Sequence, residues 1–528
     1  MKIRAAILLD NNRLTKWQMS ALTRANEKLD IELILNCNNT KSKIYFFKNF
    51  LYYIINFFSL RNSFSKVEKY TNKNIPVLNF FSEYNENWQK IPDEIYAKLY
   101  NKNIRLVIKF GMGLLRIEKK FNDIKFLSFH HGNPSKFRGR PAGFYEILNN
   151  EDTVGIIVQE LNNVLDGGKV LAFAETKTIK FSYKRTAINF YSVSEYLLIK
   201  AIENYSLGNQ IKIDKNGNNY KLPSNFTVIR FILKLIVNGF KKIIYGLFYE
   251  KKWKIALVPK LKKFRGRNII SSKDLVQIPI KSNYVFYADP YFSSNFDSIR
   301  CEALSDRKGL GDILEINIKN LRKQKVILSD LHYSHPFSFK YKNKEYLLPE
   351  VAHHSSQYFL SVNEKENKKY YIRGLENKRI LDSILIEHNN LWFIFFSESS
   401  TVNNLLNIWI SKSIYDEFKP HPKSPVLISP RYSRMGGKIL KIDDQLLRLA
   451  QNNSREYGES ITILEITELS SKEYKERQIG TINMDGFKGP HCLNLNTKTN
   501  QIVLDYYKDE FSIFSSIRRI KSKISQKK

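Results

Sequence analysis

The chain has 528 residues, of which 43% are hydrophobic and 26% are charged, so it has the composition of a globular protein but is too long for one compact core. Its three cysteines, Cys37, Cys301 and Cys492, lie far apart and form no CxxC pair, which argues against a disulfide framework or a zinc site and indicates a reducing cytoplasm. The N-terminal residues lack the features of a signal peptide. We therefore expect two or more domains in the cytoplasm, at the inner membrane surface if the chain binds lipid.

The formal net charge is +34. This excess is compatible with a nucleic-acid partner, with an anionic membrane surface, or with codon bias in an AT-rich genome. The charge is spread along the chain, and no RNA-binding signature accompanies it. A diffuse cationic field suffices for membrane contact. The composition thus favours peripheral membrane contact over nucleic-acid binding and leaves compositional bias open.

Residues 1–180 alternate strand-like and helix-like segments. Apolar runs at 3–9, 31–35 and 104–110 predict buried strands, and 17–29 predicts an amphipathic helix. This alternation predicts an α/β Rossmann-like, mainly parallel sheet. The Gly111-Met112-Gly113 sequence lacks the third glycine of a nucleotide fingerprint.

Two further segments are apolar. Residues 44–60 are apolar on nearly every face, which favours burial and leaves a membrane interface as the alternative. Residues 181–250 are expected to form a helical connector. Its helix, 226–248, has one apolar stripe and predicts docking between two cores.

The pattern changes after Trp253, where short strand-like runs are separated by polar turns. Such runs predict an all-β sandwich, barrel or propeller, and a length of 251–515 suits a propeller. Residues 516–528 form a basic tail.

One histidine and one aspartate mark a candidate site in the first domain. His130 ends an apolar strand, and Asp166 follows the strand at 154–158. Ligands of open α/β sheets bind beyond the carboxyl ends of the strands, and an aspartate can orient a catalytic imidazole. On the pattern alone, a structural histidine is the alternative.

The same stretch resembles the folate-dependent formyltransferase family, which includes methionyl-tRNA, glycinamide-ribonucleotide and sugar N-formyltransferases. The resemblance rests on His130, Arg138-Gly139, Asp166 and Phe110-Gly111, in order and spacing. It implies catalysis by His130 and Asp166 with N10-formyltetrahydrofolate as co-substrate and without a metal. It further implies that the co-substrate is bound by Phe110, Gly111, Gly113, Arg138 and Gly139.

Ser128 departs from the family pattern, which has an asparagine two residues before the histidine. The resemblance implies that this asparagine donates a hydrogen bond to the formyl oxygen, and such a donor can contribute about two to three orders of magnitude in rate. Ser128 replaces it only if the substrate sits closer or a water bridges the gap. Otherwise the site is a degenerate binding site.

Residues 251–515 resemble the five-bladed propeller of glycosyl-hydrolase family 43-like domains, in the version fused to glucosamine inositolphosphorylceramide transferases. The motifs include Ala288-Asp289-Pro290, Cys301-Glu302 and Leu348-Pro349-Glu350. On this fold, hydrolases use axial carboxylates as base and acid, so Asp289, Glu302 and Glu350 are the candidates. Carbohydrate binding or a structural role is the alternative that we favour.

The sequence as a whole predicts an N-formyltransferase that acts on a nucleotide-linked amino sugar in surface-polysaccharide synthesis. A sugar is preferred to tRNA because the second domain looks carbohydrate-related. A degenerate carbohydrate-binding protein and a glycosidase or glycosyltransferase acting through the propeller remain the alternatives.

Overall fold

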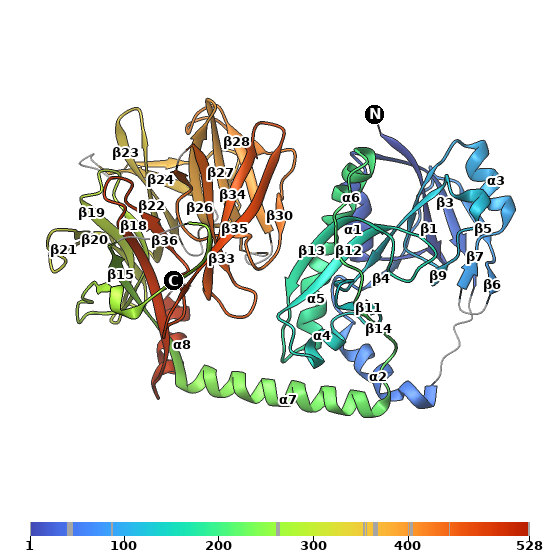
Figure 1. Ribbon diagram of the computed structural model, residues 1–528, viewed down its shortest axis with the longest axis horizontal. Helices are drawn as coiled ribbons and strands as arrows, with labels where there is room; N and C mark the ends of the chain where they lie inside the picture. The colour runs from blue at the N-terminus through green and yellow to red at the C-terminus, as the bar shows by residue number, and fades with distance from the viewer. Residues whose placement is uncertain are drawn as a thin grey trace. The chain divides into compact units, whose positions relative to one another are not determined.

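The computed structural model describes residues 2–39, 46–85, 88–259, 264–351, 354, 356–362, 368–399, 401, 405–442 and 444–525. Residues 44 and 45 of the apolar segment and 526–528 of the basic tail lie outside this description. The chain divides into two compact units, Met1–Phe240 and Lys241–Lys528 (Figure 1).

The first unit is built on a mixed sheet with a parallel core. In spatial order, the parallel strands are β5 (Val77–Phe80), β3 (Leu29–Cys37), β1 (Ile3–Asp10), β8 (Leu106–Lys109) and β10 (Lys125–His130). Two antiparallel strands, β12 (Thr153–Glu160) and β13 (Lys169–Lys177), extend the sheet beyond β10. The strand order reverses at β1, as in doubly wound folds. The predicted α/β, mainly parallel sheet is confirmed.

Helices lie on both sides of this sheet (Figure 1). They are α1 (Lys16–Ala25), α3 (Asp93–Asn101), α5 (Tyr183–Ser194) and α6 (Leu197–Ser206). Ala6 and Leu8 of β1 point to the side covered by Leu99 of α3, because side chains alternate along a strand. α5 and α6 pack against β13 and against α1. These two helices fall in the stretch expected to be a connector, and they belong to the first unit.

The remaining elements of the first unit are shorter or peripheral. They are β2 (Arg13–Thr15), α2 (Phe46–Ser59), β4 (Val67–Lys69), β6 (Glu83–Asn85), β7 (Trp88–Lys90), β9 (Leu114–Leu115), β11 (Phe137–Gly139), α4 (Phe144–Leu148), β14 (Asn218–Tyr220) and the first part of α7 (Asn225–Phe248).

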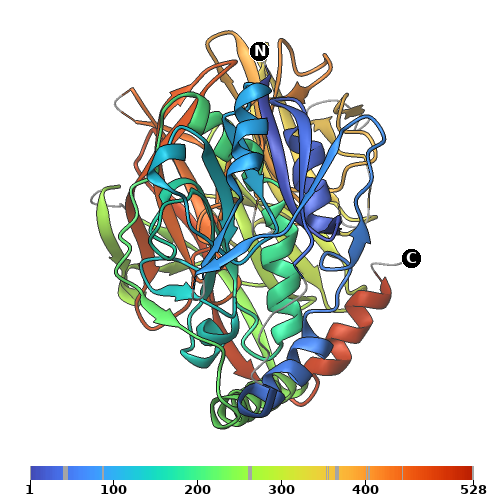
Figure 2. The ribbon, with the colours of Figure 1, turned by 90° about the vertical axis from the view of Figure 1, so that its right-hand side faces the viewer.

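Helix α7 begins in the first unit and runs into the second. Val228 and Phe231 are buried beside Tyr52 of α2 and Phe144 of α4, and both views show α2 beside the first half of α7 (Figures 1 and 2). Most of the predicted apolar stripe is nevertheless exposed, including Ile236 and Phe240. The first turns of α7 dock through Val228 and Phe231, which lie outside the predicted stripe, so the prediction that the stripe itself is buried is wrong for most of its residues.

The second unit consists of five β-sheets among the described residues, nearly all antiparallel. The first sheet contains β15 (Tyr249–Val258), β17 (Val276–Gln277), β36 (Leu493–Leu495) and β37 (Ile502–Phe511). The second contains β18 (Tyr284–Phe292), β19 (Ser298–Ser305), β20 (Gly311–Asn317) and β21 (Gln324–Leu328). The third contains β22 (Tyr333–Tyr341), β23 (Lys344–Val351), β24 (Tyr358–Ser361) and β25 (Lys369–Tyr371).

The last two sheets are larger. One contains β26 (Ile380–His388), β27 (Leu391–Glu398), β28 (Leu405–Ser411), β29 (Lys419–Pro420) and β30 (Leu427–Ile428). The other contains β16 (Gly266–Ile270), β31 (Arg434–Met435), β32 (Leu440–Ile442), β33 (Gln445–Asn452), β34 (Ser460–Leu469) and β35 (Tyr474–Met484). The prediction of an all-β region is confirmed. Helix α8 (Ser515–Ser525) follows β37.

Three consecutive sheets share a distortion in their first strand. The pairing register shifts around Asp289 in β18, His335 in β22 and Asp382 in β26. Each of these residues has a left-handed backbone, with φ between 47° and 50°. A bulge with such a residue re-aims its side chain. β18 also packs against β22, and β22 against β26, so the three bulges belong to neighbouring strands.

Within the described residues, no helix combines the length and the apolar character needed to cross a bilayer.

Candidate functional sites

The imidazole of His130 contacts the carboxylate of Asp166 at the end of β10. Nδ1 lies 3.3 Å from Oδ1, and the two side chains are only 9% and 12% exposed. The other ring nitrogen, Nε2, lies 3.2 Å from the carbonyl oxygen of Phe137. The ring thus faces a carboxylate oxygen through one nitrogen and a carbonyl oxygen through the other, which fixes its orientation.

The loop around Asp166 fixes this carboxylate. Asp166 has a left-handed backbone with φ of 48°, which Asp adopts more readily than most residues. Its Oδ2 accepts a hydrogen bond from the backbone N–H of Gly139 at 2.7 Å. Gly132 makes room for the imidazole, because a Cβ there would lie 2.6 Å from Nε2 of His130. Backbone geometry thus sets the orientation of both groups.

Lys109, Ser128 and His130 project from one face of the sheet. Ser128 is the cross-strand partner of Lys109 on β8 and of Gln159 on β12, and His130 follows two residues later on the same face. Gln159 lies 3.4 Å from Asp166 through its amide nitrogen. Three side chains able to donate hydrogen bonds are therefore collected on the face where Asp166 lies.

Lys109 was not singled out by the sequence analysis. It is 9% exposed, and its Nζ donates a hydrogen bond of 2.9 Å to the carbonyl of Met112. Burial lowers the pKa of Lys109 to about 8, although the charges of Asp10 and Asp166 act in the opposite direction. A lysine inside the apolar run that ends at Phe110 is the signal that could have identified it.

His131 points away from this face. Its Nε2 lies 2.9 Å from Oγ of Ser194, and its ring packs against Trp17 and Phe190. Burial, together with the neighbouring His130, lowers the pKa of His131 to about 3, so the ring is neutral. His131 belongs to the core and takes no part in the His130 site.

The residues expected to contact the co-substrate fall into two groups. Phe110 stacks on Phe129, one residue before His130, with ring centroids 6.0 Å apart, so the ends of β8 and β10 lie together. Gly111 is required by a close backbone approach, because a Cβ there would lie 2.4 Å from the carbonyl carbon of Leu9. The N–H of Gly113 donates to the side chain of Gln89 at 2.5 Å.

Arg138 and Gly139 form the second group. Nε of Arg138 donates to the carbonyl of Gly217 at 2.8 Å, and a Cβ on Gly139 would lie 2.1 Å from the carbonyl oxygen of Tyr220. The cavity that they share with His130 has a volume of about 10 Å³, which is room for little more than a water molecule. Arg138 and Gly139 thus hold the loop whose backbone N–H, at Gly139, donates to Asp166. A folate-sized group needs space elsewhere around His130.

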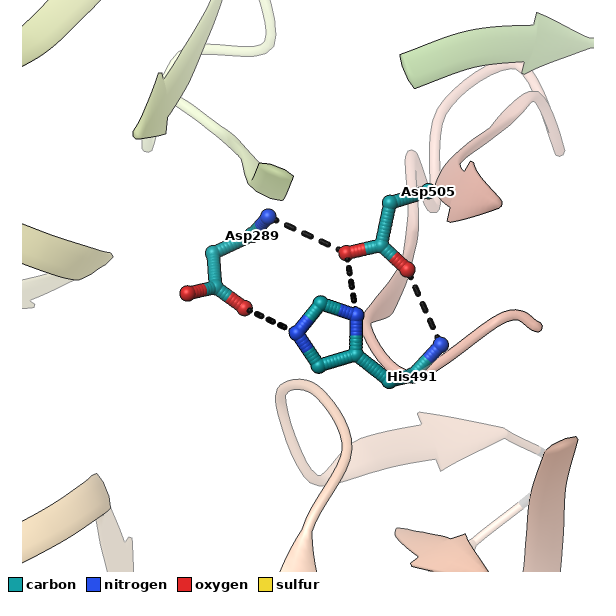
Figure 3. Close-up of side chains that lie close together, drawn as sticks. All are labelled: Asp289, His491 and Asp505. Atoms are coloured by element: carbon teal, nitrogen blue, oxygen red, sulfur yellow. Dashed lines mark hydrogen bonds and ion pairs between the residues drawn. The ribbon is translucent and has the colours of Figure 1, made fainter. Parts of the chain in front are cut away.

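In the second unit, the candidate Asp289 belongs to a buried group of three charged residues (Figure 3). Nε2 of His491 lies 3.1 Å from Oδ1 of Asp289, and Nδ1 lies 2.8 Å from Oδ2 of Asp505. Burial disfavours the cation, but the charges of Asp505 and Asp289 raise the pKa of His491 to about 10. Burial also opposes ionisation of Asp289, yet the charge of His491 lowers the pKa of that carboxyl to about 2. The group is an imidazolium between two carboxylates.

Asp505 anchors this group from β37. Its carboxylate accepts hydrogen bonds from the backbone N–H groups of Asp289 at 3.0 Å, His491 at 2.9 Å and Cys492 at 3.0 Å. Asp289, His491 and Asp505 are close enough together to offer ligand atoms to a metal ion. The separations of 2.8 and 3.1 Å are those of ion pairs between the imidazole and the two carboxylates.

The other two candidates, Glu302 and Glu350, lie within electrostatic range of Asp289. Burial, with the charges of Asp289 and Glu350, raises the pKa of Glu302 well above its usual value. Burial and the charge of Asp382 raise the pKa of Glu350 to about 8, against the effect of Arg434. Asp289 is therefore ionised at neutral pH, and Glu350 is mostly protonated.

Asp382 and Arg434 complete the cluster and were missed by the sequence analysis. Arg434 pairs with Asp382, with Nη2 of the guanidinium 3.3 Å from Oδ1, and the backbone N–H of Asp382 donates to Glu350 at 3.2 Å. Asp382 could have been found, because Asp289, His335 and Asp382 follow one another at spacings of 46 (289 to 335) and 47 (335 to 382) residues. No comparable signal marks His491 or Asp505.

A ligand-sized cavity adjoins this cluster. It has a volume of about 520 Å³, and Trp253 and Tyr457 line it together with residues of α8. The rings of these two residues lie 4.1 and 5.4 Å from the ring of His491. Only the rings of Trp253 and Tyr457 would thus separate a small molecule in this cavity from His491.

Comparison with known proteins places a recognisable region in the second unit. A family model described as glucosamine inositolphosphorylceramide transferase 1, N-terminal, matches residues 322–503. Glucosamine inositolphosphorylceramide transferase 1 of Oryza sativa subsp. japonica is 28% identical over 169 residues, which are 31% of this chain and 23% of that protein. The Arabidopsis thaliana protein is 29% identical over 155 residues, which are 28% of this chain and 20% of that protein. The alignments thus cover about a quarter or less of these plant proteins.

Solved structures similar to this chain include formyltransferases and a formyltetrahydrofolate deformylase. Phosphoribosylglycinamide formyltransferase from Anaplasma phagocytophilum is 14% identical, with a TM-score of 0.29 and coverage of 43% of this chain and 96% of that chain. A sugar N-formyltransferase from Shewanella is 12% identical, with a TM-score of 0.29 and coverage of 44% and 87%. A formyltetrahydrofolate deformylase from Pseudomonas putida is 13% identical, with a TM-score of 0.28 and coverage of 42% and 71%.

Proposed function

We propose that the first unit transfers a formyl group from N10-formyltetrahydrofolate to the amine of a nucleotide-linked amino sugar during surface-polysaccharide synthesis. The observation that carries this proposal is the buried contact of His130 with Asp166 at the carboxyl end of a strand in a doubly wound sheet. The spacing of His130, Arg138-Gly139 and Asp166, which resembles the formyltransferase family, supports it.

The hydrogen-bond donors beside Asp166 suit the transfer of a formyl group. When bound, the co-substrate supplies a carbonyl carbon that an amine can attack, and negative charge then develops on the carbonyl oxygen. Lys109, Ser128 and His130 present N–H or O–H groups on one sheet face, and such preorganised donors stabilise a developing oxyanion. Phe110, Gly111 and Gly113, at the end of β8, are the residues that the resemblance assigns to hold the co-substrate.

Asp166 holds the imidazole of His130 in position through Nδ1. To act on a substrate, Nε2 of His130 exchanges the carbonyl of Phe137 for the substrate oxygen. The sugar as acceptor is supported by the second unit, whose residues 322–503 are similar to the N-terminal part of a transferase named for glucosamine. The alternative hypothesis is a protein that binds its ligands without catalysing formyl transfer, because Ser128 replaces the amide donor of the family pattern.

The test is to offer the purified protein N10-formyltetrahydrofolate and a panel of nucleotide-linked amino sugars and to measure tetrahydrofolate release and formylated sugar. We expect one sugar to be formylated, and we expect His130→Asn to lower the rate by about two to four orders of magnitude. His354→Asn, an exposed histidine of the second unit, is the matched control. Binding of the co-substrate without formylation of any amine would favour the hypothesis of a binding protein without catalytic activity.

For the second unit, we infer that its five sheets are the blades of a five-bladed propeller that binds glycan. Support comes from the pairing of β15 with β37, which brings the two ends of the β-region into one sheet. Support also comes from the inward re-aiming of Asp289, His335 and Asp382. The ligand-sized cavity lined by Trp253 and Tyr457 suits a sugar, since sugars stack on aromatic rings.

Glycoside hydrolysis by the second unit is the second candidate. One specific observation favours it: Asp289 is ionised while Glu350 holds a proton near neutral pH, which is the division of roles that an acid/base pair needs. Against it, Oδ1 of Asp289 faces His491 and Oδ2 accepts from the N–H of His335 at 3.3 Å. A base engaged on both oxygens is poorly placed to activate water, so binding remains the preferred role.

A further inference from the structure

Three helices of this protein present apolar side chains to solvent. On α7, six such residues lie on one arc of about 100°, at 3.6 residues per turn, and each is at least 45% exposed: Phe226, Ile229, Leu233, Ile236, Phe240 and Ile243. Isolated exposed apolar residues need no explanation, but a continuous stripe of this length marks a binding surface.

In the first unit, α2 adds to this stripe. Phe50, Ile54, Phe57 and Phe58, after the kink at Asn49, share one side of α2. Phe58, and Phe47 before the kink, are 70% and 91% exposed. The opposite side of α2, with Tyr52, packs into the core beside Phe231 of α7. Asn225 at the start of α7 donates to the carbonyl of Phe47 at 2.9 Å, which ties the two helices together. The exposed side of both helices therefore belongs to a folded surface.

In the second unit, α8 carries a matching stripe. Ile517, Ile520 and Ile524 follow one another at helical spacing and are 55–61% exposed. The helix is docked by its other side, since Arg518 pairs with Glu250 at 2.6 Å and Oγ of Ser515 donates to the carbonyl of Leu247 at 2.6 Å. Its polar contacts hold α8 in place and leave the isoleucines outside.

We propose that α2, α7 and α8 bind the surface of an anionic lipid bilayer, with their apolar stripes among the headgroups and upper acyl chains. The net positive charge of the chain favours an anionic lipid surface as the partner of these helices. The chain carries 85 Lys and Arg against 51 Asp and Glu, and Lys523 lies next to Ile524 of the α8 stripe. An amphipathic helix with a basic border binds lipid through both burial and attraction to anionic headgroups. This inference does not depend on the proposed formyl transfer.

The test is co-sedimentation of the full chain with vesicles of phosphatidylcholine alone or mixed with phosphatidylglycerol. We expect binding to the mixed vesicles, weaker binding to neutral ones, and release as salt is raised. Two triple variants address the units separately: Phe226→Ser with Leu233→Ser and Phe240→Ser, and Ile517→Ser with Ile520→Ser and Ile524→Ser. Each should weaken vesicle binding at least about tenfold, because each removes apolar burial from one stripe.

The matched control is Val67→Ser with Ile269→Ser and Val326→Ser, three comparably exposed residues outside these helices. It should bind vesicles like the wild type, and circular dichroism should show all variants folded. Equal binding by all variants, or equal binding to neutral and anionic vesicles, would overturn the proposal. So would a dimer in solution that the α7 or α8 variants dissociate, because the stripes would then be an interface between two copies.

Discussion

The two units place charged groups in their interiors by different means. In the first unit, His130 and Asp166 are 36 residues apart (130 to 166); His130 ends β10, and Asp166 lies in the loop between β12 and β13 of the same sheet. In the second, Asp289, His491 and Asp505 come from segments up to 216 residues apart (289 to 505) and meet only because the sheets pack around them. A site made within one sheet can be recognised as a motif, whereas a site made between sheets leaves scattered single residues.

The two sites also differ in how fully their charges are engaged. His130 has one carboxylate partner and one carbonyl partner that a substrate can replace. His491 has carboxylates on both nitrogens, and Asp505 accepts three backbone hydrogen bonds besides. The first arrangement suits turnover, and the second suits the cohesion of the fold. Each of the following changes should separate these two roles.

The largest effect is expected for Asp505→Asn in the second unit. The substitution leaves the buried imidazolium of His491 with one carboxylate fewer, and breaking a buried pair costs about 3–5 kcal/mol. Urea unfolding followed by tryptophan fluorescence measures this loss, since the Trp253 ring lies 4.1 Å from that of His491. The control is Asp444→Asn, whose side chain is 98% exposed. A stability like that of the control would mean that His491 is not held as a cation.

A smaller effect is expected for Ser128 in the first unit. If its hydroxyl has taken over the donor role, Ser128→Ala should lower formyl transfer by about two to three orders of magnitude, and Ser128→Asn should preserve or raise it. Steady-state rates with the identified sugar measure both. If neither change alters the rate, Ser128 has no part in stabilising the oxyanion, and Lys109 becomes the donor to test.

The third effect is a pH dependence of the second unit's stability. The folded-state pKa of Glu350, about 8, lies above the ordinary value of 4.5, so its contribution to stability is fully present below pH 4.5 and is lost as the pH rises through 8. Within this window the slope is at most about 1.4 kcal/mol per pH unit. Glu350→Gln should flatten the curve of unfolding free energy against pH. An unchanged slope would show that Glu350 does not keep its proton in the folded state.

The smallest effect is expected for Asp289→Asn on the chemistry of the first unit. Formyl transfer should be unchanged, because Asp289 belongs to the other unit. Glycoside cleavage should be absent from both wild type and variant if the second unit only binds glycan. Cleavage by the wild type that the variant loses would make Asp289 a catalytic base, since an amide cannot accept the proton. The second unit would then be an enzyme in its own right.

Much of this protein was determined by the sequence alone. The apolar runs at 3–9 and 104–110 become β1 and β8, and the short runs after Trp253 become antiparallel strands, because the length and the apolar character of a run are local properties of the sequence. His130 and Asp166 were paired by the resemblance to the formyltransferase family, whereas the pattern alone left a structural histidine as the alternative; their side chains lie 3.3 Å apart.

Tertiary structure alone decided the rest. Lys109 is only an interruption of an apolar run in the sequence, and its position opposite Ser128 comes from the pairing of β8 with β10. His491 is likewise an ordinary histidine in the sequence, and only the packing of β18 and β37 around it brings it between Asp289 and Asp505. The exposure of the α7 stripe is a further case, since a periodic pattern shows that a helix has an apolar side but not what covers it. Sequence periodicity reports local geometry, whereas the environment of a charge or of an apolar face depends on segments that are distant in the chain.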